Sequence, residues 1–211
     1  MRRLAAKGAV LALLTGCGSV ANEDAALGQA IAAVSGGSEY EPRFTALLKA
    51  EAPALQVAFI DSGLAGTLLL ERRKGPYEYW LSPDGGQLIL QNGILHGTRG
   101  FGEGLLSSEL SEPIARVRGL REGPSDRFHT YLDGNDRAVT RTYRCLIEVA
   151  GPREVTLGER KVPTQLVRED CRSLDQSFKN LYWVTPDNGR IIQSRQWAGP
   201  YLGEISTRII P

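Results

Sequence analysis

From Leu55 onward, apolar and polar residues alternate in short runs, and Gly, Pro, Asp and Asn residues separate one run from the next. This pattern is typical of antiparallel strands joined by tight turns. The predicted strands are Leu55–Ile60, Thr67–Arg72, Tyr77–Leu81, Gln87–Leu90, Ile94–Thr98, Phe128–Leu132, Val139–Val149, Glu154–Leu157, Val162–Glu169, Asn180–Val184, Arg190–Trp197 and Gly203–Ile209. So many short strands predict an all-β fold, an antiparallel barrel-like or strongly curved sheet, with a short helical N-terminal segment.

Turns and helices are marked by their own residue types. Asp84–Gly86, Asp133–Asp136 and Asp187–Gly189 lie between strand-like runs, and Asp, Asn and Gly tolerate the positive φ of tight hairpins. A helix is predicted over Glu41–Glu51, with Pro42 near its first position. The preceding stretch to Gly37 is compatible with either a short helix or an extended tether.

The N-terminus has the pattern of an export signal. Arg2, Arg3 and Lys7 precede the short apolar run Gly8–Leu14. Leu14-Thr15-Gly16-Cys17 then resembles the lipobox of bacterial lipoproteins, in which small residues precede a cysteine that is lipidated after cleavage. The alternatives are an ordinary signal peptide with a chance cysteine and a short buried helix.

The lipobox interpretation implies a domain organisation and a location. We expect a signal peptide over residues 1–16, a tether or short helix over 17–40, and a single β-rich domain over 41–211. Two or more acyl chains on Cys17 would hold the mature protein on a membrane. Gly18, rather than Asp, favours the outer membrane by the enterobacterial sorting rule, with the domain facing the periplasm.

The net charge of the chain argues against nucleic acid as a partner. The whole chain has a formal net charge of +1, and the signal accounts for three of its 25 basic residues and none of the 24 acidic ones. The mature chain therefore carries about −2 and has no strongly basic stretch, so nucleic acid is a poor partner. A run of about 18 apolar residues, the minimum for a spanning helix, is also missing from the sequence.

Cys145 and Cys171 are predicted to form a disulfide, because export places them in an oxidising compartment. Gly158 lies midway between them, so a single hairpin over Val139–Glu169 would place them opposite each other, with Cβ atoms about 5 Å apart. Gly151-Pro152 and Pro163 argue against an uninterrupted ladder. Pairing across a three-strand meander and two separate buried thiols remain alternatives.

Candidate catalytic groups form no recognisable constellation. His96 and His129 have no partner at metal-ligand spacing, and no nucleophile elbow occurs, so we expect no metal, no cofactor and no enzymatic activity. The glycine-dense run Gly97–Gly104 does not fit a dinucleotide fingerprint, and we predict a flexible or bulged strand-to-loop segment there. A glycosidase would need two facing carboxylates. The candidates, none singled out by spacing, are Glu103, Glu109, Glu112, Asp126, Asp133 and Asp136.

Four aromatic residues gather near the C-terminus, on or beside the best-marked hairpin: Tyr182, Trp183, Trp197 and Tyr201. Aromatic faces can stack on sugar rings, so these residues are candidate glycan contacts. The alternative is that they fill the core, and neighbours such as Tyr182 and Trp183 must point to opposite faces of a strand.

Several segments together resemble the YjbF-type, or group 4 capsule polysaccharide, lipoproteins. They are Trp80–Ser82, Leu88–Leu95, Gly100–Leu105, Asn180–Val184, Gly189–Trp197 and Gly199–Gly203, with the lipobox at Cys17. The resemblance implies an outer-membrane lipoprotein produced together with capsule or exopolysaccharide machinery, and a mostly antiparallel barrel-like fold. It supplies no catalytic residues, and only Cys17 acquires a role from it.

The sequence therefore predicts a non-enzymatic accessory lipoprotein for capsule or exopolysaccharide secretion or assembly. Its expected partners are the membrane, and a polysaccharide or proteins of the export apparatus. The alternatives are a periplasmic glycan-modifying hydrolase or lyase, and an envelope lipoprotein that binds lipid or another protein.

Overall fold

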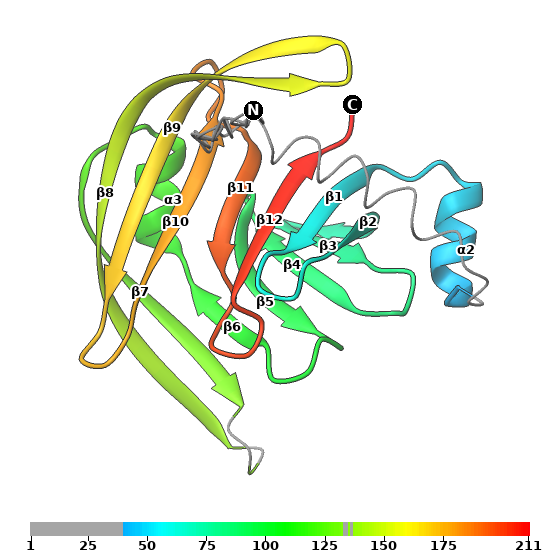
Figure 1. The fold of residues 1–211 in the computed structure, drawn as a ribbon, viewed down its shortest axis with the longest axis horizontal. Helices are drawn as coiled ribbons and strands as arrows, with labels where there is room; N and C mark the ends of the chain where they lie inside the picture. Colours follow the sequence, from blue (N-terminus) through cyan, green and yellow to red (C-terminus); the bar gives the residue numbers. More distant parts are fainter. Residues whose placement is uncertain (1–39, 133–134, 136) are drawn as a thin grey trace, which may run out of the picture.

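The computed structural model describes residues 40–132, 135 and 137–211, and most of these residues after Pro53 belong to one antiparallel sheet (Figure 1). The strands are β1 (Ala54–Phe59), β2 (Leu64–Lys74), β3 (Tyr77–Leu81), β4 (Gln87–Gln91), β5 (Ile94–Arg99), β6 (Leu105–Glu109), β7 (Gly123–Leu132), β8 (Ala138–Leu157), β9 (Arg160–Arg172), β10 (Ser177–Val184), β11 (Ile191–Trp197) and β12 (Glu204–Ile209). The helices are α2 (Pro42–Lys49) and α3 (Ser111–Arg118). The predicted all-β class is confirmed.

The sheet curls into a nearly closed barrel. Its strand order is β5-β4-β3-β2-β1-β12-β11-β10-β9-β8-β7-β6, so the first and last strands pair and the two sheet edges are consecutive in the chain. The edges β5 and β6 lie side by side without a regular ladder. They approach so closely at Gly97 that a Cβ atom there would lie 2.9 Å from the carbonyl oxygen of Leu106, which explains why this position lacks a side chain.

The longest hairpin joins β8 to β9, and its outer part bends over one end of the barrel toward the C-terminus (Figure 1). Cys145 pairs with Cys171 in its register and the two form a disulfide, so the predicted hairpin and the predicted disulfide are confirmed. The ladder shifts by one residue between Val149 and Gly151. Pro152 and Pro163 follow in the part of the hairpin that pairs with neither β7 nor β10, where a missing backbone donor is tolerated.

The sequence predicts one of the two helices. Helix α2 lies where a helix is expected, with Pro42 in its first turn and the Glu41 carboxylate accepting a hydrogen bond from the Phe44 amide. Between Thr98 and Phe128, however, the pattern predicts only a loop, and the structure forms β6 and α3 there. The prediction was wrong because both elements are short and depend on tertiary packing, which fully buries Leu105 and Val117.

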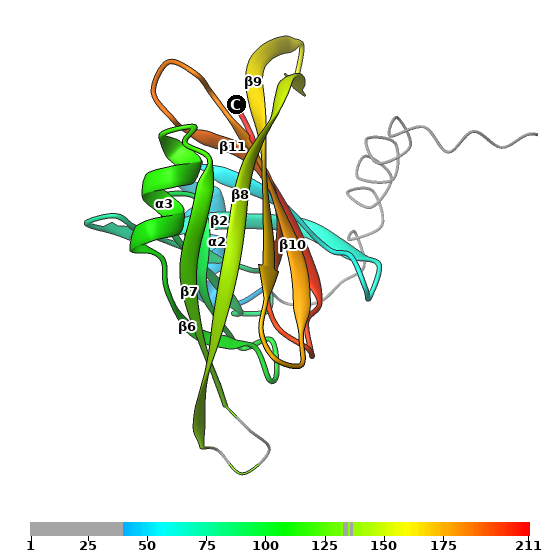
Figure 2. The same cartoon turned by 90° about the vertical axis from the view of Figure 1, so that its left-hand side faces the viewer.

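Helix α3 covers one end of the barrel interior beside β7, β8 and β10 (Figure 2). Its apolar residues join a cluster made of inward-facing residues of β8, β9 and β10: Leu110, Ile114 and Val117 pack on Ile147, Val167, Tyr182 and Val184. Helix α2 instead packs on the outer face of β2, through Phe44 and Leu69. The interior therefore opens mainly between β1–β4 and β11–β12.

Candidate functional site

The inward faces of β7, β9 and β10 carry a cluster of buried polar side chains. Arg127, Glu169 and Tyr182 are each at most 1% exposed. The Tyr182 hydroxyl donates to Glu169 Oε2 at 2.8 Å, and Arg127 Nη2 lies 3.5 Å from the same oxygen. Asn180 Nδ2 also donates to it at 2.8 Å. Because one carboxylate oxygen accepts hydrogen bonds from Tyr182 and Asn180 and also forms an ion pair with Arg127, Glu169 is the centre of this cluster.

Burial and these contacts shift the protonation equilibria of the cluster. Burial raises the pKa of Tyr182 well above its usual value, so the phenol remains a hydrogen-bond donor. Burial alone would lower the pKa of Arg127, but the Glu169 carboxylate and Tyr182 together outweigh burial and raise it, so the guanidinium stays charged. His129, which bonds to the Tyr131 hydroxyl at 2.8 Å, has a pKa well below its usual value, first because of burial and second because of Arg127. The cluster therefore holds a charged guanidinium beside a neutral histidine.

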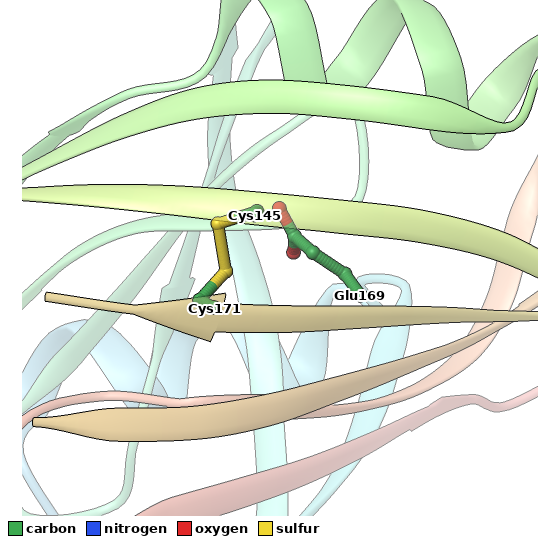
Figure 3. A group of neighbouring side chains, drawn as sticks. All are labelled: Cys145, Glu169 and Cys171. Atoms are coloured by element: carbon green, nitrogen blue, oxygen red, sulfur yellow. A yellow bond between two sulfur atoms is a disulfide. The ribbon is translucent and has the colours of Figure 1, made fainter.

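The disulfide lies next to this cluster (Figure 3). Cys145, Cys171 and Glu169 form the group of potential metal ligands found among residues 40–132, 135 and 137–211, with ligand atoms within 4.8 Å of one another. Thiolates bind metals, whereas both sulfur atoms here are consumed by the disulfide. This part of the site is consequently a covalent brace between β8 and β9, and not a metal centre.

A pocket of about 250 Å³ opens at the barrel end where β2 and β4 finish and β11 begins. Its floor contains Trp80 and Leu90, and its rim carries three arginines: Arg73, Arg118 and Arg190. The other lining residues are Pro53, Ala54, Leu55, Gly75, Pro76, Glu78, Asn92, Gly93, Ile191, Ile192, Gln193, Thr207, Ile209 and Ile210. We call this the arginine-rimmed pocket.

The arginine-rimmed pocket has an excess of positive charge. Arg73 Nε lies 3.1 Å from a Glu78 carboxylate oxygen and forms an ion pair with it. In the described part of the chain, Arg118 and Arg190 have no carboxylate within ion-pair distance. Trp80 is 4% exposed, and its indole N–H, a donor that is normally paired when buried, has no protein acceptor in the same part of the chain. The pocket can therefore offer guanidinium and indole donors to an anionic or hydroxyl-rich ligand.

A larger and more apolar cavity, which we call the apolar groove, lies at the opposite end of the barrel. It measures about 780 Å³, and the β1–β2, β3–β4 and β11–β12 turns contribute to it together with α2. Its apolar lining residues are Tyr40, Phe44, Leu48, Val57, Phe59, Leu64, Ala65, Leu68, Leu69, Phe101, Tyr201 and Leu202. Leu64 and Tyr201 are more than 60% exposed there, so this end presents apolar side chains to its surroundings.

The structure separates the four aromatic residues predicted as glycan contacts. Tyr182 is fully buried in the polar cluster, whereas Trp183 lies on the opposite face of β10, against the cluster of Val155, Leu157 and Ile192. Trp197 stacks on Phe178, and Tyr201 is 63% exposed at the apolar groove. They do not form one surface, and glycan contact by any of them stays a prediction.

The other predicted residues also lie apart. Cys17 and the signal fall outside the described residues, as do Asp133 and Asp136. His96 is half-buried beside Tyr77, with the ring centroids 5.0 Å apart. The Gly97–Gly104 segment closes the barrel edge: Phe101 packs on Phe59.

Three of the four described carboxylate candidates accept hydrogen bonds from neighbouring groups. Glu109 accepts from the Ser111 amide, and Glu112 accepts from the Asp126 amide. The Asp126 carboxylate in turn accepts from Arg144 at 2.8 Å. Glu103 lies exposed in the loop before β6. These contacts indicate structural roles, since each carboxylate binds a nearby backbone amide or arginine of the fold.

Sequence reasoning missed the most polar residues of the structure. Arg127 and Glu169 give no signal, because isolated charged residues in strands usually face water. Arg118 lies in the unpredicted helix α3, and Arg190 begins a predicted strand but reads as an ordinary turn residue. Trp80 and Arg190 belong to segments that resemble the family, but nothing in the sequence marks either as a residue that lines a pocket.

The fold is that of an antiparallel barrel protein with a binding-sized pocket at one end, and comparison with known proteins gives it a family. The family model described as group 4 capsule polysaccharide lipoprotein gfcB, YjbF, matches residues 28–210. The chain therefore belongs to this lipoprotein family, which confirms the resemblance seen in the sequence. Curated protein sequences give no match.

A solved structure supports the fold. The crystal structure of the hypothetical lipoprotein YmcC from Escherichia coli (K12) superposes with a TM-score of 0.68 at 18% sequence identity. The match covers 81% of this chain and 89% of that one. At this identity the similarity establishes the shared architecture. No helix within residues 40–132, 135 and 137–211 is long and apolar enough to cross a membrane.

Proposed function

We propose that this protein is a non-enzymatic accessory lipoprotein that supports capsule or exopolysaccharide secretion or assembly at the outer membrane. The observation that carries the proposal is the family match over residues 28–210. In this proposal Cys17 is lipidated and the barrel faces the periplasm. The barrel holds nascent polysaccharide or docks on proteins of the export apparatus.

The arrangement of the barrel is compatible with a holding role. A twelve-stranded sheet surrounds a pocket lined by arginines and Trp80, whose N–H groups are hydrogen-bond donors suited to a polar ligand. Binding needs neither an activated nucleophile nor a pair of facing carboxylates. The ion pair between Arg127 and Glu169 is buried, and neither residue lines the arginine-rimmed pocket. Its position supports a structural role for that pair.

The first experiment measures surface polysaccharide in a strain that lacks the gene. We expect the yield to fall and to be restored by the intact gene, but not by a Cys17→Ala copy that cannot be lipidated. A Leu106→Ala copy is the control, because it changes an exposed side chain and leaves both the anchor and the disulfide. Unchanged yield in the deletion strain, under conditions where the parent secretes polysaccharide, would contradict the proposal.

The apolar groove favours a second candidate function, the binding of a lipid acyl chain. Its volume of about 780 Å³ and its aromatic and aliphatic walls suit an apolar ligand. Displacement of a fluorescent fatty acid from the full-length chain tests it, with Leu64→Glu as the disrupting variant and Leu146→Glu, an exposed residue on β8, as the control. Equal binding by both variants would argue against the groove as a lipid site.

A further inference from the structure

The arginine-rimmed pocket lies where side chains from several turns converge at one end of the barrel. The β2–β3 hairpin contributes Arg73 and Glu78, the C-terminal end of α3 contributes Arg118, and the start of β11 contributes Arg190. These elements are distant in the sequence, so the charge excess is a product of the fold and not of a basic run.

Hydrogen bonds hold the Arg118 guanidinium and the backbone of the turn that carries Arg190. Arg118 Nε donates to the Gly189 carbonyl oxygen at 3.0 Å, which leaves its terminal nitrogens available. The Arg190 backbone N–H donates to Thr185 Oγ1 and Asn188 Oδ1, so the turn does not depend on the Arg190 side chain. A guanidinium presents its donors as a planar fork that matches a carboxylate or phosphate. The rim is therefore prepared for an anion.

The floor of the pocket suits the rest of a sugar. Trp80 supplies an aromatic surface and a buried indole N–H without a partner in the described residues. Asn92 and Gln193 add amide groups at the wall. A ligand that combines a negative charge with hydroxyl groups and an apolar ring face would use all three kinds of group.

We propose that the arginine-rimmed pocket binds an acidic sugar residue of a polysaccharide chain, with Arg118 and Arg190 contacting its anionic group and Trp80 contacting its ring. This inference rests on the proposed function, since it names the kind of glycan that the lipoprotein holds. The volume of about 250 Å³ limits the occupant to a single sugar or chain end, with the remainder of the polymer outside.

Calorimetric titration of the full-length chain in detergent tests the inference, with hyaluronan hexasaccharide as the acidic probe and maltohexaose as the neutral one. We expect hyaluronan to bind more tightly and its affinity to fall with salt. Arg190→Glu should weaken it at least about tenfold, because a hydrogen-bonded charge pair is replaced by a repulsive one. Arg172→Glu, on an exposed arginine of β9, is the matched control and should bind as the parent does.

The results separate this inference from the proposed function. Equal affinity for both hexasaccharides, equal effects of the two substitutions, or equally tight competition by inorganic phosphate alone would overturn the acidic-sugar site. If the producer's own polysaccharide still binds Arg190→Glu at parental affinity, the holding role stands and this pocket is not its site. If hyaluronan binds as expected but deletion of the gene leaves polysaccharide yield unchanged, the site stands and the proposed function fails.

Discussion

The two halves of the barrel interior are built on different principles. Strands β1–β5 and β12 enclose aliphatic side chains such as Leu55, Leu68 and Leu88, together with Trp80. Strands β7–β11 enclose Arg127, Glu169, Asn180 and other polar groups beside the apolar cluster under α3, and the disulfide braces them. We call these the apolar half and the polar half.

The difference shows that burial alone does not measure stability. A fully buried leucine contributes about 1.5–3 kcal/mol by leaving water. A buried ion pair has to offset a desolvation cost of several kcal/mol for each ion, and often gives no net gain over apolar residues. We infer that the apolar half supplies most of the folding free energy, whereas the polar half fixes one arrangement of side chains, because its groups must all find partners.

The largest expected effect comes from leaving one charge of the polar half alone. Glu169→Ala should lower the free energy of unfolding by about 3–5 kcal/mol, since Arg127 would stay buried without its carboxylate. Urea denaturation measures this. The double variant Arg127→Met, Glu169→Leu should recover most of the loss, and a double variant as unstable as the single one would contradict the unpaired-charge explanation.

In the apolar half, truncating a buried side chain should lower the free energy of unfolding, and no second substitution of a charged partner can restore it. Leu88 is 0% exposed, and Leu88→Ala should cost about 2–5 kcal/mol through lost burial and the cavity left behind. The matched control is Leu106→Ala on β6, where the side chain is 46% exposed and a change within about 0.5 kcal/mol is expected. Similar losses in the two variants would show that the apolar half is not the tighter core.

Removing the disulfide tests how far the polar half relies on its covalent brace. Cys145→Ala, Cys171→Ala should lower the free energy of unfolding by about 2–4 kcal/mol, because the denatured chain regains the freedom of the closed loop. The parent unfolded under reducing conditions should match the variant. A transition midpoint that is the same with and without reductant would mean that the ladder alone holds β8 to β9.

A smaller effect is expected from pH. His129, which faces Arg127, Tyr131, Tyr143 and Phe178, has a pKa well below its usual value in the native state, chiefly because of burial. Below about pH 6.5, His129 is therefore protonated in the unfolded chain but remains neutral in the native state. Stability should fall by about 1.4 kcal/mol per pH unit until the native-state pKa is reached, and be fully present above pH 6.5.

The variant His129→Phe isolates that contribution, since it keeps an aromatic ring next to Phe178. Its stability should depend less steeply on pH than that of the parent between pH 5 and about 6.5, the unperturbed value for histidine. His96 has a lowered pKa as well, again through burial, and remains in both proteins. Identical slopes would assign the pH dependence to groups other than His129.

The sequence predicts the hairpins well because their signals are local. Gly158 and the equidistant cysteines predict both the β8–β9 hairpin and its register, and the aspartate- and glycine-rich turns mark other strand ends. The same locality explains the failures. Helix α3 has only eight residues and is stabilised by Val117 and Ile114 packing on strands far away in the chain.

The candidate site was largely beyond prediction for the same reason. In β7, the charged Arg127 points inward and the apolar Phe128 is 38% exposed, the reverse of what hydrophobicity suggests. Only the partner Glu169, supplied by a strand that arrives later in the chain, makes this orientation acceptable. Arg118 and Arg190 likewise become neighbours only once the barrel has formed.

The pairing of β1 with β12 has a consequence for how the chain folds. Every other ladder joins strands that are consecutive in sequence and can form as a hairpin, but Leu55 pairs with Ile209 across nearly the whole domain. Closing such a long loop costs conformational entropy before the contacts can stabilise the fold, and this slows folding. A chain that emerges N-terminus first therefore carries β1 as an unpaired edge until its last strand is released, and this interval is when it is most exposed to aggregation.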